Sequence, residues 1–549
     1  MRLMSSSAAV LTVCLASAHA LAAQQIRPYR PAFDVQDYAI TIDLPDTGST
    51  IHVNDVITVE RPGKADTLVL DLLDLRVNSV SVDGRSVHFV QTQTNVDVPL
   101  PRKRGSRPSY RVAVDYGGAV TDGLIVRTDS AGRWTYFGDN FPDRARHWIA
   151  SIDHPSDKAT VTWRVRAPEG RTVVANGKLV AKRNVQDAAG ERRVEWEWRE
   201  SRPISVYLMV IAAAPLEVYD LGDTACGLAV RQRCVPQMVY TAPEQHASMP
   251  GAFARAPEIV ALFARLVGPF PYEKLAHLQS STRFGGMENA SDIFYSDRAF
   301  RRGTMNDGLI AHETSHQWFG DAVTEREWSN LWLSEGFATY FAALWTRAAR
   351  GDSAFRADLT HIRAAVLADT IAVTKRPVID TIERNYMALL NRNSYEKGGF
   401  VLQMLRAQVG EGAFFDALRE YYMAHRNSTA LTSDLQAAME HQSKQKLGWF
   451  FDQWLRRPGY AELTVKWTYD VTAHEVVVDL NQGDRFGAYQ FPVTIAVVDS
   501  AGGTHRATAE MPAVAGQARQ LRIPLAAAPA HLIVDPDVQL LAAITVIQQ

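Results

Sequence analysis

The sequence has little of what would place it in several common classes of protein. Neither charge is in excess, since its 549 residues include 58 lysine and arginine and 60 aspartate and glutamate residues. A nucleic-acid-binding surface needs a basic excess, so we predict no nucleic-acid partner. Beyond the first two dozen residues there is no apolar run long enough to span a bilayer, and there is no internal repeat or low-complexity tract. With 46% hydrophobic and 21% charged residues, the composition is that of a globular protein.

Cysteine is also scarce, with three residues in the whole chain. Cys14 lies in a segment that we expect to be removed, which leaves Cys226 and Cys234, eight positions apart with a glycine between them. A disulfide that closes a hairpin is the favoured interpretation, and two buried free thiols are the alternative. Neither residue lies near the motifs described below, so we predict no catalytic cysteine.

The first 23 residues have the pattern of a secretory signal peptide. Arg2 is their only charged residue, the run 8–18 is apolar, and both Ala18-His19-Ala20 and Ala20-Leu21-Ala22 offer a small-x-small cleavage site. We therefore expect an exported protein, periplasmic or extracellular, with no membrane span after the signal is removed. An uncleaved N-terminal anchor is the alternative.

The rest of the chain is too long for one compact core, and the spacing of its apolar residues divides it into three segments. Residues 24–240 alternate apolar and polar side chains with a period of two, which predicts an all-β domain. Residues 241–460 change to a helical period, with helices expected over 252–267, 307–319, 327–349, 394–409 and 446–456. Residues 461–549 return to alternation and predict a small immunoglobulin-like β-sandwich. The predicted fold class is thus a multidomain α+β protein.

The stretch AHETSHQWFGD at 311–321 carries the first chemical motif. Asn306 or Asp307 can cap a helix in which His312 and His316 stand one above the other on the same face, close enough to bind one zinc ion. Glu313 projects from the adjacent face, where it can reach a water molecule without becoming a ligand. HExxH also occurs by accident in unrelated chains, so the motif needs a third ligand.

Glu335 is the predicted third ligand. A metzincin would need glycine at 319 and histidine at 322, and the chain has Phe319 and Ala322, so that class is excluded. Glu335 stands in the apolar run LWLSEGFA, where a carboxylate is costly unless it is paired or bound to a metal. The alternative, a carboxylate paired with an arginine, would leave the two histidines without a partner.

These motifs together resemble the gluzincin aminopeptidases, the family that includes aminopeptidase N and leukotriene hydrolase. HETSH is followed after eighteen residues by the glutamate of WLSEGFATY and is preceded by GGMEN at 285–289. RHWIASIDHPSDKAT and SYEKGGFVLQML also look like that family, so the resemblance covers nearly the whole chain after the signal peptide. It implies a thermolysin-like, mainly helical catalytic domain with one zinc per chain.

The resemblance also implies a role for each motif residue. Glu288 grips the free amino group of a peptide substrate, Glu313 is the general base, and Tyr395 stabilises the oxyanion. Gly285, Gly286 and Met287 let the substrate backbone pair with this segment as a strand would. A further acid or amide from the first domain is expected beside the amino group, with Asp139 or Asn140 as the nearest candidate.

Other functions stay open at this point. A thermolysin-like endopeptidase would share the metal residues but have no use for Glu288, and a non-catalytic peptide-binding protein would normally have lost Glu313 or a ligand. Epoxide hydrolysis rests on resemblance to one branch only. Larger family members have a C-terminal helical domain that this sequence does not show, so we expect a more open site or one closed by an oligomer, with a monomer favoured. The sequence does not predict the preferred first residue of the substrate.

Overall fold

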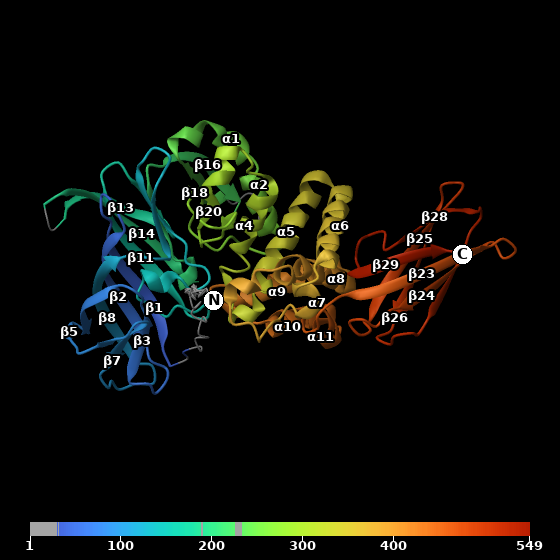
Figure 1. Cartoon of the computed structure of the whole chain (residues 1–549), viewed down its shortest axis with the longest axis horizontal. Coiled ribbons are helices and arrows are strands. Elements are labelled where there is room, and N and C mark those ends of the chain that lie inside the picture. The colour runs from blue at the N-terminus through green and yellow to red at the C-terminus, as the bar shows by residue number, and fades with distance from the viewer. Residues whose placement is uncertain (1–29, 31, 188–189, 226–232) are drawn as a thin grey trace, which may run out of the picture.

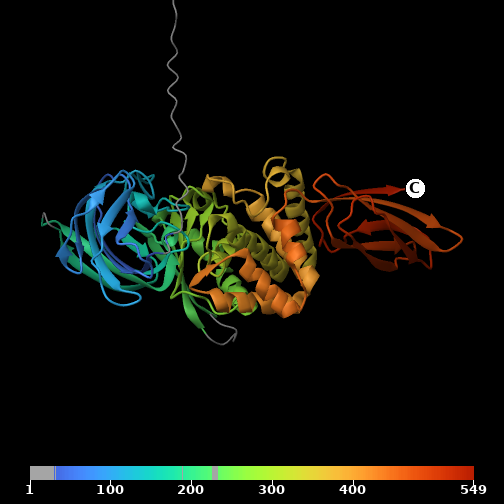
Figure 2. The same cartoon turned by 90° about the horizontal axis from the view of Figure 1, so that it is seen from below.

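The computed structural model describes residue 30 and residues 32–187, 190–225 and 233–549. The predicted signal peptide lies outside this described part, and so does Cys226 of the predicted Cys226–Cys234 disulfide. The molecule is elongated, with β-structure at both ends and a helical centre, and two perpendicular views show the same order (Figures 1 and 2). Among the described residues, no helix combines the length and the apolar character that crossing a bilayer requires.

The N-terminal part consists of β-sheets, as predicted. Its main sheet has eight strands, in the order β13 (Lys178–Gln186), β14 (Arg192–Ser205), β11 (Lys158–Pro168), β1 (Asp34–Asp43), β2 (Thr50–Glu60), β8 (Ser109–Ala119), β4 (Arg76–Val82) and β5 (Arg85–Ser86). Tyr38, Ile40 and Ile42 are buried on one face of β1, which explains the period of two in the sequence.

Two smaller sheets complete this part. One has the order β12 (Thr172–Ala175), β15 (Ile211–Ala214), β10 (Trp134–Gly138) and β9 (Leu124–Thr128), and the other has the order β3 (Thr67–Asp71), β7 (Asn95–Pro99) and β6 (Val90–Gln91). The loop after β10 leads toward the centre of the molecule, where it matters for the site described below.

The central part begins with a mixed sheet rather than with helices. Its order is β16 (Glu217–Ala225), β17 (Arg233–Thr241), β18 (Leu275–Ser280), β20 (Asp292–Ser296) and β19 (Gly286–Met287). This sheet crosses the boundary expected between residues 240 and 241, because β17, which pairs with β16 on one side, pairs on the other side with β18, a strand that follows the boundary. The change of period in the sequence marks the first helix, whereas strands before and after it share one sheet.

Helices fill the rest of the central part. They are α1 (Met249–Ala252), α2 (Ala256–Leu266), α3 (Asp297–Arg302), α4 (Asp307–His316), α5 (Trp332–Arg350), α6 (Asp352–Ala368), α7 (Ala372–Lys375), α8 (Gly398–Val409), α9 (Glu411–His425), α10 (Thr432–Ser443) and α11 (Gly448–Leu455), with a two-stranded sheet of β21 (Val323–Glu325) and β22 (Ser428–Ala430). The five predicted helices correspond to α2, α4, α5, α8 and α11. Helix α4 ends three residues earlier than expected, and the chain turns at Gly320, whose φ of 120° favours glycine.

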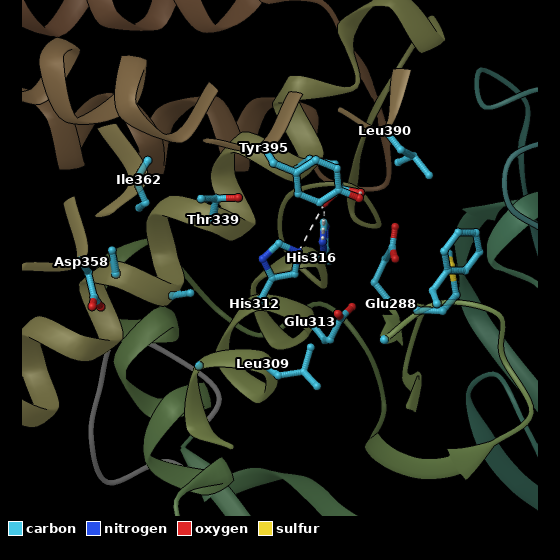
Figure 3. A pocket seen from close by; sticks show the side chains of 18 of the residues that line it. Glu288, Leu309, His312, Glu313, His316, Thr339, Asp358, Ile362, Leu390 and Tyr395 are labelled. Atoms are coloured by element: carbon cyan, nitrogen blue, oxygen red, sulfur yellow. Dashed lines mark hydrogen bonds and ion pairs between the residues drawn. The ribbon is translucent and has the colours of Figure 1, made fainter. Parts of the chain in front are cut away.

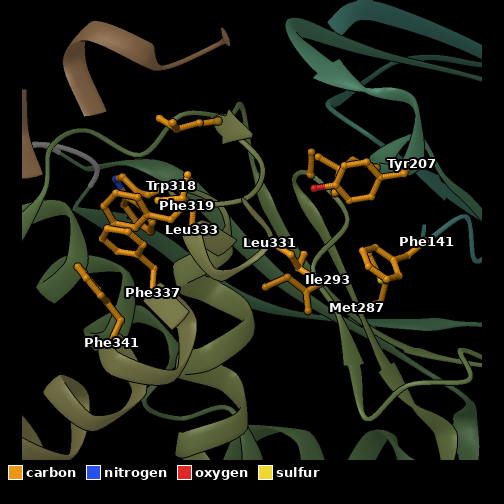
Figure 4. Close-up of a cluster of buried hydrophobic side chains, with 14 of the residues drawn as sticks. Phe141, Tyr207, Met287, Ile293, Trp318, Phe319, Leu331, Leu333, Phe337 and Phe341 are labelled. Carbon is orange, nitrogen blue, oxygen red and sulfur yellow. The ribbon is translucent and has the colours of Figure 1, made fainter. Parts of the chain in front are cut away.

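Aromatic side chains pack α4 against α5. The rings of Phe319 and Phe337 stack with centroids 4.1 Å apart, and Phe341 packs on the same group (Figure 4). All three side chains are buried. Because Phe319 follows α4 directly and Phe337 belongs to α5, this packing fixes the two helices that carry the predicted metal ligands.

A half-buried lysine joins the N-terminal part to the loop after α4. Lys158 Nζ, at the start of β11, donates hydrogen bonds to the carbonyl oxygens of Asp321 at 2.7 Å, Ala322 at 3.0 Å and Ser428 at 3.1 Å, and to Thr324 Oγ1 at 3.0 Å. An ammonium group with several acceptors is held in one place, so the two parts keep a fixed relation beside the site.

The C-terminal part consists of two β-sheets, as predicted. One has the order β27 (Arg519–Pro524), β24 (Glu475–Gln482), β23 (Ala461–Asp470) and β29 (Ala542–Gln548), and the other has the order β26 (Thr504–Met511), β25 (Phe491–Asp499) and β28 (Pro529–Val534). Leu463, Val465 and Trp467 are buried, in agreement with the alternation in the sequence. Arg363 of α6 binds Asp535 across the boundary, at 2.7 Å between Nη1 and Oδ2.

Candidate functional site

Helix α4 positions three of the predicted residues. Its first turn is capped by Asn306, whose side chain accepts a hydrogen bond from the Leu309 backbone N–H at 3.0 Å. One turn apart, His312 and His316 place their ring centroids 5.0 Å from each other. Glu313 projects from the neighbouring face of the helix, is buried, and points into the same cavity (Figure 3).

Glu335 comes from α5 to complete a set of three possible ligands. Its Oε2 lies 3.4 Å from His312 Nε2 and 3.5 Å from His316 Nε2. Ligand atoms of a tetrahedral zinc, with bonds of about 2.0 to 2.1 Å, are about 3.3 to 3.4 Å apart. Oε2 is also buried without a hydrogen-bond partner in the described structure. The spacing and the unpaired oxygen both fit a zinc ion held by these three side chains.

The back of His316 is held by its surroundings. Its Nδ1 lies 2.9 Å from Ser334 Oγ and 3.3 Å from the carbonyl oxygen of Phe319. A carbonyl oxygen only accepts hydrogen bonds, so a hydrogen on Nδ1 satisfies it and leaves the lone pair on Nε2, on the side of Glu335. Such a partner behind the ring is the usual way in which a metal-binding histidine is oriented.

The GGMEN segment forms the opposite wall. Strand β19 pairs with β20 and is the last strand in the sheet order, so its outer edge carries no other described strand. Glu288 follows β19 directly, and its carboxylate oxygen, one of Glu313 and Nε2 or Nδ1 of His316 all lie within 4.8 Å of one another. Burial raises the pKa values of Glu288 and Glu313 above the usual range of a glutamate.

Tyr395 reaches the site from the turn before α8. It lies on η6 (Asn393–Lys397), a single π-helical turn, a feature that is frequent at functional sites. Its hydroxyl donates a 2.7 Å hydrogen bond to Glu335 Oε1, and burial raises the pKa of the phenol well above its usual value. The approach of α8 to α5 depends on two glycines, since a Cβ on Gly336 would lie 2.9 Å from the backbone of Gly398.

The predicted residues line one cavity of about 530 Å³. Glu288 and Leu390 lie at one end, and Thr339, Ile362 and Asp358 lie at the other, beyond the histidines (Figure 3). The cavity thus continues on both sides of the three possible ligands. Its volume is in the range of sites that bind a small molecule or a short peptide.

The candidates from the first domain do not reach this cavity. Asp139 is buried beside Arg144, at 3.2 Å, and Asn140 uses its side chain to bind the indole N–H of Trp148 at 2.8 Å. The next residue in the chain, Phe141, lines the cavity instead. The prediction of a polar group in FGDN was therefore wrong for this cavity, and an aromatic residue directly after that motif lines it instead.

Family models match two long segments of the chain. Residues 35–208 match the peptidase M1 N-terminal domain, and residues 255–454 match the peptidase family M1 domain. The chain belongs to peptidase family M1. The resemblance to the aminopeptidase N family expected from the motifs is thereby confirmed, and the second match contains every proposed metal ligand.

Individual relatives of this M1 chain agree with that assignment. Aminopeptidase N of Streptomyces lividans is 27% identical over 464 residues, which cover 80% of this chain and 52% of that protein. Leucyl aminopeptidase of Saccharolobus solfataricus is 24% identical over 472 residues, which cover 80% of this chain and 56% of that protein. The chain therefore spans about half the length of these curated relatives.

Solved structures extend the similarity to the fold. An M1 zinc metallopeptidase from Deinococcus radiodurans superposes with a TM-score of 0.66 and 27% identity, covering 77% of this chain and 93% of that one. A variant of the same enzyme has been solved with a peptide substrate bound. Aminopeptidase A of Legionella pneumophila has a TM-score of 0.79 over 94% of this chain and 60% of that one, at 16% identity, which shows a shared fold.

Proposed function

We propose that this M1 chain is a zinc-dependent aminopeptidase that removes the first residue from peptides with a free N-terminus. The observation that carries the proposal is the position of Glu288, whose carboxylate lies within 4.8 Å of His316 and Glu313. In an amino acid, the nitrogen and the carbonyl carbon are about 2.5 Å apart. An ammonium group on Glu288 therefore leaves the carbonyl of the same residue beside the proposed metal ligands, so that the first peptide bond is the one attacked.

His312, His316 and Glu335 would hold one zinc ion. When bound, zinc polarises the scissile carbonyl and lowers the pKa of water to about 7. Glu313 lies beside the ligands without belonging to their set, so it takes a proton from the attacking water as general base. It then delivers this proton to the nitrogen of the leaving peptide.

Glu288 and Tyr395 orient the substrate. A cation against the buried carboxylate of Glu288 offsets the cost of burying that carboxylate, which favours a free N-terminus over an acylated one. Tyr395 keeps its proton at neutral pH, since a phenol ordinarily titrates near pH 10 and burial raises its pKa further. With substrate bound, its hydroxyl would donate to the oxygen that becomes negative in the transition state instead of to Glu335 Oε1. Both groups act on the same residue of the substrate.

Two further features support peptides as the substrate class. The cavity continues past His312 to α6, which leaves room for residues on the leaving side. Relatives of about twice the length are named aminopeptidases, and the Deinococcus enzyme binds a peptide substrate. Export with removal of the signal peptide, and a monomeric state, remain predictions from the sequence.

The decisive experiment compares free and blocked peptides. Matched fluorogenic substrates with a free or an acetylated N-terminus are measured with the purified protein, before and after removal of metal by a chelator and restoration with zinc. We expect cleavage of the free substrate to depend on zinc and to exceed that of the acetylated one by about 30- to 3,000-fold, from the value of one buried charge pair. Equal rates on the two substrates would favour an endopeptidase and refute the proposal.

A further inference from the structure

We infer that the enzyme selects a large apolar first residue, and that Phe141, Phe284, Met287 and Leu390 form the pocket that receives it. The inference rests on the proposed function, since it takes the substrate amino group to lie on Glu288. The side chain of the first residue branches from the same carbon atom as that amino group. It must therefore lie against the walls of the cavity nearest to Glu288.

Those walls are apolar. Met287 precedes Glu288 in the chain, and Phe141 lies beside Met287 (Figure 4). Phe284 packs edge-to-face against Phe141, with ring centroids 6.0 Å apart. Leu390 lies at the same end of the cavity as Glu288 and is partly exposed to it (Figure 3).

The pocket is also held rigidly from behind. The ring of Phe141 packs on Trp328, with centroids 5.1 Å apart, and on Tyr207, with centroids 5.9 Å apart. Trp328 in turn contacts Tyr386, four residues before Leu390, at 6.0 Å. One aromatic cluster thus supports both walls, so the shape of the pocket is set before substrate binds.

Charge in the cavity works against an acidic first residue. The described residues that line it include the carboxylates of Glu288, Glu313, Glu335 and Asp358, and no lysine or arginine. An aspartate or glutamate side chain at the first position would lie against the apolar walls close to Glu288, with no lysine or arginine among the described lining residues to pair with it. An alanine side chain would leave the apolar walls unfilled and gain little from them.

The test is a panel of aminoacyl fluorogenic amides that differ only in the first residue. For the zinc-loaded enzyme, we expect kcat/KM for phenylalanine, leucine and methionine amides to exceed that for the alanine amide by about 10-fold and that for the glutamate amide by about 100-fold. As a readout without turnover, free L-phenylalanine should raise the Tm of the protein more than L-glutamate does at the same concentration.

Two variants at one position test the location of the pocket. Leu390→Arg adds a cation at its wall, and Leu390→Gln is the matched control of similar length without charge. We expect Leu390→Arg to raise the ratio of glutamate to leucine cleavage by at least about 10-fold over Leu390→Gln. Phe141→Ala should reduce the preference for phenylalanine over alanine. Its melting curve shows whether this variant folds. If it does not fold, the two Leu390 variants decide the location of the pocket.

The outcomes separate this inference from the proposed function. Wild-type rates on the alanine or glutamate amide within about threefold of the leucine amide would overturn the specificity and leave the aminopeptidase activity intact. Equal ratios for the two Leu390 variants would overturn the assignment of that wall. Absence of cleavage on every amide would refute the proposed function and the specificity with it.

Discussion

Gly286 offers a sharp test of the geometry around the proposed general base. A Cβ added at this position would lie 2.2 Å from Glu313 Oε1 and 2.3 Å from its Cδ. Real contacts of this kind begin near 3.4 Å, so the carboxyl group must move by about 1 Å. Because the displaced atoms are the far end of a flexible side chain, Gly286→Ala should move Glu313 without preventing folding.

The expected loss follows from that displacement. A misplacement of about 1 Å in a catalytic group lowers the rate by about 100-fold, which corresponds to about 2.7 kcal/mol of activation free energy. The metal ligands are not the groups in contact, so zinc binding should persist. Gly286→Ala should therefore lower kcat by about 100-fold while the zinc content and Tm stay close to those of the wild type.

The assay measures kcat on a leucine amide, zinc by mass spectrometry and Tm by calorimetry. Gly285→Ala is the comparison, since a Cβ at Gly285 would meet no atom within 4 Å, and its loss should be clearly smaller. Glu313→Gln gives the rate without a base and sets the lower limit. If Gly286→Ala kept the wild-type kcat, Glu313 would not need its position beside β19, and its assignment as general base would be wrong.

Three further predictions concern other residues. Glu335→Gln removes the one negatively charged donor of the three proposed ligands and should lower the zinc content of the purified protein after dialysis, as measured by mass spectrometry, while Tyr395→Phe should lower kcat by about 100- to 1,000-fold with zinc retained. Asp157 is buried; among the described residues the Val35 N–H donates to Oδ1 and Oδ2 has no hydrogen-bond partner, and burial raises its pKa to about 8. The folded protein then holds a proton that the unfolded chain releases near pH 4, so the free energy of unfolding should fall as the pH rises from 4 to 8, by up to about 1.4 kcal/mol per pH unit. Urea unfolding at pH 5 and pH 8 should show a smaller difference for Asp157→Asn, and an unchanged difference would contradict the assignment.

Local periodicity was sufficient to predict most elements of the fold. The alternation in the first domain agrees with β1, which buries one face, and the helix expected over 307–319 is observed over 307–316. The sheet of the central part was not predicted, since β16 and β17 alternate like the strands before them. Which sheet a strand joins depends on contacts distant in the chain, and alternation carries no information about its partners.

The three proposed metal ligands could be selected from the sequence because their arrangement is mostly local. His312 and His316 are one helical turn apart, and only the placement of Glu335 required a second helix. The position of Glu288 was expected from family resemblance alone, because nothing in the sequence indicates that a strand end will lie beside α4. Phe141 was not predicted as a lining residue, because an aromatic residue after a strand is usually packed in a core.

The site gathers negative charge at a position where solvent cannot screen it. Glu288, Glu313 and Glu335 are all buried around His316, and burial raises the pKa values of the first two. Ionised carboxylates in such a place destabilise the protein when no metal ion or substrate is bound, unless other cations lie against them. The proposed function supplies two, a divalent metal at Glu335 and the ammonium group of the substrate at Glu288. Burying ionised carboxylates is unfavourable in the empty site. For the same reason the site favours a zinc ion at Glu335 and a free N-terminal ammonium group at Glu288.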